Sequence, residues 1–156
     1  MKNYTSEVAV EKTVARIEEA LVRSGASNIM KEYVAGRVSG ISFALPNPNG
    51  GKAIIRLPAN FDAVYDVLRK QVKRPNPHTQ QRLQEQSERT AWKLMQDWVE
   101  VQLSLVEMRQ AEPLEVFLPY IWNGQRSFYA HVKEAGFTAL PAPLPSLQVK
   151  RPSDSD

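Results

Sequence analysis

The sequence predicts an α+β fold: an N-terminal helix, a three-stranded antiparallel meander and a second helix, followed by a long apolar helix and short C-terminal helices. Three observations lead to this prediction. Strand-like segments cluster between residues 28 and 57, helical periodicity dominates the second half, and the segment Gln80–Gln110 keeps apolar stripes along most of its length. Because strands come first and most helices later, the order does not fit a parallel doubly wound sheet.

The first predicted helix runs from Ser6 to Ser24. Ser6 is a residue type that caps helix N-termini, and Gly25 suits the left-handed position just past the C-terminus. One stripe of this helix is apolar and is predicted to face the core; it contains Val10, Val14, Ile17 and Leu21.

Three strands are predicted at residues 28–34, 38–45 and 52–57. Ala35-Gly36-Arg37 gives a tight reversal, and residues 46–51 are rich in proline, asparagine and glycine, which favour turns. The order helix, three strands, helix is that of double-stranded-RNA-binding domains. Those domains carry a lysine cluster at the start of the second helix, where this chain has Ala59-Asn60-Phe61-Asp62.

A shorter helix is predicted from Asn60, its cap, to about Gln71, with Phe61, Val64, Tyr65 and Leu68 facing inward. A proline-containing loop of residues 72–78 follows. The long helix then carries two apolar stripes and one narrow polar strip. The stripes are Ala91, Leu94, Trp98, Val101, Leu105 and Met108, and Trp92, Met95, Val99, Leu103 and Val106; the strip is Lys93, Asp97, Glu100, Ser104 and Glu107.

Short helices are predicted at residues 114–120, after Pro113 in the first turn, and at residues 127–135, before Gly136. Residues 1–140 are predicted to form one domain. Residues 141–156 are rich in proline, serine and charge, which is typical of an unstructured tail.

Composition narrows the classes of function. The chain of 156 residues has a net charge of +3 and no cysteine, which excludes disulfides and thiolate chemistry. It shows neither a membrane-spanning run nor an N-terminal signal sequence. We therefore expect a cytoplasmic protein.

Catalytic and metal-binding motifs are not evident. His78 and His131 are the two histidines, and neither lies in a nucleophile motif or at metal-ligand spacing. Asn49-Gly50-Gly51 leads into a strand, whereas a phosphate-cradling loop leads into a helix. We expect no catalytic residue, no metal site and no cofactor, and a function that is not enzymatic.

The positive signal is a basic segment. Between Val67 and Gln84 there is no acidic residue, but there are six candidate phosphate ligands: Arg69, Lys70, Lys73, Arg74, His78 and Arg82. Lys52 and Arg56 on the outer face of the sheet are candidates to extend this patch. Tyr120 and Trp122, and less readily Tyr65, are candidates to stack on a base. The alternative is an ordinary basic loop in solvent.

The two apolar stripes of the long helix present more apolar surface than the predicted sheet can cover. We therefore expect a homo-oligomer, in which one stripe packs against a second copy. The alternative is a monomer in which residues 114–120 fold back over that stripe.

Several segments of the chain are similar to a family of small phage and prophage proteins that are usually recorded as hypothetical. They are residues 8–14, 41–43, 56–59, 88–93, 97–103 and Glu115-Val116-Phe117-Leu118-Pro119-Tyr120. The resemblance implies an accessory protein that acts inside a bacterial cell for a mobile element. Two functions fit: counter-defence, by sequestering a nucleotide-type signal or blocking a host defence protein, and nucleic-acid binding in phage replication or recombination.

Overall fold

The computed structural model describes residues 9–74 and 76–145, and all structural statements below refer to these residues. The chain forms helix α1 (Val10–Arg23), strands β1 (Ser27–Val34), β2 (Arg37–Pro46) and β3 (Lys52–Pro58), and helix α2 (Phe61–Arg69). The long helix α3 (Pro77–Glu107), helix α4 (Pro113–Phe117), the 3₁₀ turn η1 (Leu118–Tyr120) and helix α5 (Phe128–Glu134) follow. The predicted α+β class and element order are confirmed.

The sheet has the order β1-β2-β3 with both pairs antiparallel. The β1–β2 turn is tight because Ala35 (φ 50°) and Gly36 (φ 77°) both adopt left-handed backbone. Phe43 pairs with Ile55 and Ile41 with Leu57, and all four side chains are buried. One face of the sheet is therefore the core face.

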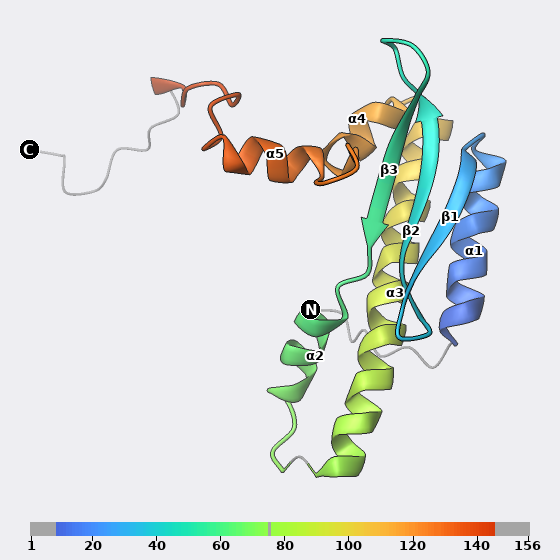
Figure 1. The fold of residues 1–156 in the computed structure, drawn as a ribbon, viewed down its shortest axis with the longest axis vertical. Helices are drawn as coiled ribbons and strands as arrows, with labels where there is room; N and C mark the ends of the chain where they lie inside the picture. The colour runs from blue at the N-terminus through green and yellow to red at the C-terminus, as the bar shows by residue number, and fades with distance from the viewer. Residues whose placement is uncertain (1–8, 75, 146–156) are drawn as a thin grey trace, which may run out of the picture.

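Helices α1 and α3 lie side by side along that face (Figure 1). Trp92 of α3 is fully buried, and its indole Nε1–H donates to the carbonyl of Val38 in β2 at 3.1 Å. This bond fixes the rotation of α3 relative to the sheet. The buried apolar core contains Val14, Ile17, Leu21, Ile41, Phe43, Leu45, Ile55, Leu57, Trp92, Val99 and Phe117.

The two stripes of α3 have different environments. Trp92 and Val99 of the second stripe are fully buried. In the first stripe, the exposed fraction is 57% for Val101 and 70% for Met108, so the helix is open to solvent toward its C-terminal end. The inward residues of α2 are half-buried, since this helix packs on α3 at the margin of the core.

The predicted limits of two helices were wrong. Helix α1 begins at Val10, after an extended Ala9 that forms no side-chain cap, and Ser6 lies outside the described residues. Helix α3 was predicted to begin near Thr79 or Gln80 but begins at Pro77. Asn76 caps it by accepting from the N–H of Thr79 at 2.9 Å, and a first-turn proline needs no N–H partner.

The C-terminal part forms an arm. Helix α5 contacts η1 and extends away from the sheet, and the chain beyond it leads farther from the body (Figure 1). Residues 141–145 are exposed, while residues 146–156 of the predicted tail lie outside the described range. None of the described helices combines the length and apolar character needed to cross a membrane.

Candidate functional site

The six candidate phosphate ligands lie together at one end of the molecule, around the connection between α2 and α3 (Figure 1). We call this set the basic loop. Arg69 ends α2, Lys70, Lys73 and Arg74 lie in the connection, and His78 and Arg82 lie in the first two turns of α3. All six side chains are exposed.

None of the six side chains of the basic loop forms an ion pair with another described residue. Among the described residues, the ion pairs are formed by other side chains, such as Lys31 with Glu18 and Lys93 with Asp97. Helix α3 begins next to the loop, and the partial positive charge of its N-terminus has the same sign as the side chains. The C-terminus of α2, at Arg69, adds a partial negative charge, so the net positive charge of the loop comes from its side chains.

Two of the three candidate stacking residues, Tyr120 and Trp122, are not near the basic loop. Tyr120 packs edge-on against Trp98, with ring centroids 5.3 Å apart. Trp98 lies 20 residues beyond His78 on the continuous helix α3, which corresponds to roughly 30 Å at 1.5 Å per residue. Tyr65 is half-buried on α2. The structure therefore does not bring Tyr120 and the loop cations into one compact pocket.

Tyr120 and Trp122 instead line a second feature, a cleft of about 570 Å³ at the base of the arm, which we call the aromatic cleft. It forms because the chain after η1 returns to the sheet: the N–H of Trp122 donates to the carbonyl of Ile54 at 2.8 Å. The lining residues are Arg56, Pro58, Pro119, Tyr120, Trp122, Arg126, Ser127, Tyr129 and Ala130.

The two arginines of the aromatic cleft are both neutralised. Arg56 donates to both carboxylate oxygens of Glu32 at 2.7 Å, and its guanidinium lies 4.6 Å from the ring centre of Trp122. These hydrogen bonds raise the pKa of Arg56 and lower that of Glu32. Arg126 pairs with Glu134 and lies 2.9 Å from Nδ1 of His131, which is exposed. The cleft is therefore an aromatic surface with almost no free charge.

Lys52 also does not extend the basic loop. Its Nζ reaches across β2 to Ser27 and Asn28, at 3.0 and 2.9 Å, on the outer face of the sheet. Lys52 and Arg56, which were predicted to extend the basic patch, therefore both bind side chains of β1 instead.

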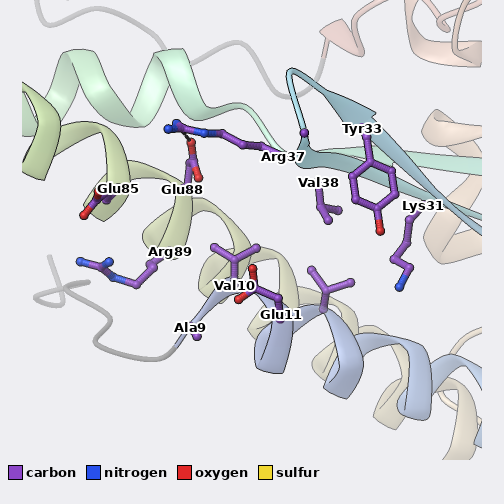
Figure 2. Close-up of a pocket in the computed structure, with 12 residues that line it drawn as sticks. Ala9, Val10, Glu11, Lys31, Tyr33, Arg37, Val38, Glu85, Glu88 and Arg89 are labelled. Atoms are coloured by element: carbon purple, nitrogen blue, oxygen red, sulfur yellow. Dashed lines mark hydrogen bonds and ion pairs between the residues drawn. The ribbon is translucent and has the colours of Figure 1, made fainter.

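A second cleft, of about 360 Å³, lies where α1, the β1–β2 hairpin and α3 meet (Figure 2). Arg37 points to Glu88 and pairs with it, while Tyr33 and Lys31 lie on the opposite side (Figure 2). The Lys31 ammonium is held by Glu18 at 3.1 Å, which raises the pKa of Lys31. Because these cations are already paired, an anionic ligand would have to displace carboxylates here.

Arg126 and Tyr129 of the aromatic cleft were not identified by sequence reasoning. They reach it because Ile121 forms an isolated bridge with Ile55, a contact between distant segments that leaves no local pattern in the sequence. No group of three or more histidine, aspartate or glutamate side chains suited to a metal ion occurs in the part of the chain that the structure describes.

Comparison with known proteins found no matching family model, curated protein sequence or solved structure.

Proposed function

We propose that this protein acts by stoichiometric binding of a phosphate-bearing ligand through the basic loop. The observation that carries the proposal is the set of six exposed side chains at one end of the molecule, none of which pairs with a carboxylate in the described part of the chain. Phosphate groups are strong hydrogen-bond acceptors for lysine and arginine. One exposed ion pair contributes only about 0.2–1 kcal/mol of binding free energy, so several such contacts are needed together.

The pairing of Arg37 and Arg56 favours the basic loop over the two clefts. A ligand at Arg37 or Arg56 would have to compete with a carboxylate that is already in place, Glu88 or Glu32. A phosphate at Lys73 or Arg74 displaces only water and dissolved ions. Charge alone therefore favours the basic loop over the two clefts.

In the phage setting that the sequence resemblance implies, the ligand is a nucleotide-type immune signal, and the protein counters host defence by sequestering it. Blocking a host defence protein through the same charges belongs to the same class of function. Neither role requires catalytic residues, and a homo-oligomer would present several loops to its ligand.

Nucleic acid is the second candidate, and one observation favours it. The loop is open to solvent, and the nearest candidate stacking rings, other than the half-buried Tyr65, are those near Trp98, roughly 30 Å away. A single nucleotide does not span that distance, whereas a strand at about 3.4 Å per nucleotide spans it with about nine. Both candidates share the chemistry of phosphate recognition, and ligand length separates them.

The test is equilibrium binding of mononucleotides, cyclic dinucleotides and single-stranded oligonucleotides of increasing length. The perturbed protein is the double variant Lys73→Glu/Arg74→Glu, and the matched control is Lys12→Glu/Arg16→Glu, which reverses two exposed cations on α1. We expect the loop variant to lose at least tenfold in affinity with an unchanged melting temperature, and the control to bind normally.

Equal losses in the two variants would show that only net charge matters and would refute the loop as the site. Length-independent binding of a small nucleotide would support sequestration. Affinity that rises with length, with a logarithmic salt slope of about −3.5 if all five Lys and Arg side chains contact phosphate, would support nucleic acid.

A further inference from the structure

Residues 140–145, which follow α5, form a stiff and uncharged segment. Every residue from Leu140 to Pro145 is either a proline or the residue before one, since Pro141, Pro143 and Pro145 alternate with Ala142 and Leu144. Proline fixes φ near −65°, and the residue before it is confined to extended or polyproline II backbone. Binding this segment therefore requires little loss of conformational entropy.

This segment is also exposed. Leu140 and Leu144 have exposed fractions of 59% and 63%, and none of residues 140–145 lines the aromatic cleft of its own chain. No charged side chain occurs between Glu134 and Lys150. An apolar, uncharged and pre-extended segment of this kind is suited to an aromatic surface.

The aromatic cleft has the matching chemistry. Its walls carry the rings of Tyr120, Trp122 and Tyr129 together with Pro58 and Pro119. The guanidinium groups at its margin are paired with Glu32 and Glu134, so the cleft offers no free charge to attract an ion. Aromatic grooves of this composition bind polyproline II segments by packing proline rings between aromatic rings.

The route of the chain favours a second copy as the source of the segment. The aromatic cleft contains the N-terminal end of α5, whereas the segment leaves from the C-terminal end and leads away from the sheet (Figure 1). Within one chain, the segment would have to reverse along the whole of α5 to reach its own cleft. In a pair of copies, each arm carries the segment outward to the partner.

We infer that the aromatic cleft of one copy binds residues 140–145 of a second copy, so that the protein associates by exchange of its proline-rich segments. This inference is independent of phosphate binding at the basic loop, because the aromatic cleft shares no lining residue with the basic loop. Reciprocal exchange creates two identical contacts and gives a closed dimer with two-fold symmetry.

The test uses the full chain in sedimentation equilibrium over a range of concentrations. The cleft variant is Tyr129→Ala, and the matched control is Tyr33→Ala, the same substitution at a residue that is 57% exposed against 54% for Tyr129 but lies on the other cleft. The segment variant is Pro141→Ala/Pro143→Ala/Pro145→Ala. We expect the unmodified protein and the control to dimerise, and the cleft and segment variants to dissociate at least tenfold more readily.

Mixing the cleft variant with the segment variant is the decisive experiment. The cleft of the segment variant is intact and so is the segment of the cleft variant, so a mixture regains one contact and should form a mixed dimer that neither variant forms alone. Monomeric unmodified protein would overturn the inference. Unmodified protein whose dimerisation survives the three proline substitutions would also overturn it, and would place any interface elsewhere, such as at Val101 and Met108.

Discussion

Replacing Trp92 by phenylalanine tests the rotation of α3 against the sheet. The substitution removes the indole N–H that donates to the Val38 carbonyl at 3.1 Å. Leaving such an acceptor without its partner costs about 1–3 kcal/mol. The smaller ring also leaves a cavity of roughly 40 Å³ at a fully buried position, which adds about 1 kcal/mol. We therefore expect a loss of about 2–4 kcal/mol in the free energy of unfolding.

The assay is urea denaturation followed by far-UV circular dichroism, because three tryptophans complicate fluorescence. Trp98→Phe is the matched control. Trp98 is half-buried and meets Phe117 and Tyr120 edge-on, and it forms no described hydrogen bond through its indole. We expect a loss below about 1.5 kcal/mol, as for a volume-reducing change without an orphaned acceptor. Equal losses at Trp92 and Trp98 would refute the assignment of Trp92 as the core anchor.

Three further predictions concern single residues. Hydrogen bonds from Arg56 lower the pKa of Glu32 below its usual 4.5, so the unmodified protein should be more stable than Glu32→Gln at neutral pH. This difference in stability should disappear as the pH falls through the folded-state pKa of Glu32. A difference in urea midpoints that does not change with pH would contradict the prediction. Asn76→Ala removes the cap of α3 and should cost about 1 kcal/mol in urea denaturation, whereas an unchanged midpoint would contradict the cap. Ala35→Gly should stabilise the protein by up to about 1 kcal/mol, because alanine is strained at φ 50°; destabilisation would argue against the tight turn.

The sheet and the order of the elements could be predicted because local chemistry determines them. Asn47 to Gly51 and Ala35-Gly36 are turn residues, and the strands between them alternate in polarity. Asn60 caps α2 as predicted, by accepting from the N–H of Ala63 at 3.2 Å. Each of these signals lies within a few residues of the structure that it specifies.

The orientation of α3 could not be predicted from periodicity. Both of its stripes are apolar, and the sequence alone does not indicate which one faces the sheet. The choice depends on tertiary contacts, chiefly the bond from Trp92 to Val38 and the packing of Phe117 on Phe43, whose ring centroids are 5.2 Å apart. These contacts join residues that are far apart in sequence.

The candidate site was predicted in composition but not in geometry. The basic residues do lie together, because they are neighbours in the chain. Tyr120 packs on Trp98, which lies roughly 30 Å from His78 along α3. The return of Ile121 to Ile55 places Tyr120 and Trp122 in a cleft apart from the basic residues. Whether an arginine is free also depends on the fold, since Glu32 reaches Arg56 only because β1 and β3 flank β2.

The two proposed interactions should respond differently to salt, because the basic loop has unpaired cations and the arginines of the aromatic cleft are paired. Phosphate binding at the basic loop depends on unpaired cations, so added salt should weaken it steeply. Docking of residues 140–145 in the aromatic cleft involves no free charge, so sodium chloride should leave it nearly unchanged and sulfate should strengthen it by favouring apolar burial. A single salt series on the unmodified protein, with ligand binding and sedimentation measured side by side, therefore separates the two interactions. Loss of both at the same ionic strength would mean that self-association also depends on charge, and the aromatic cleft could not then be the interface.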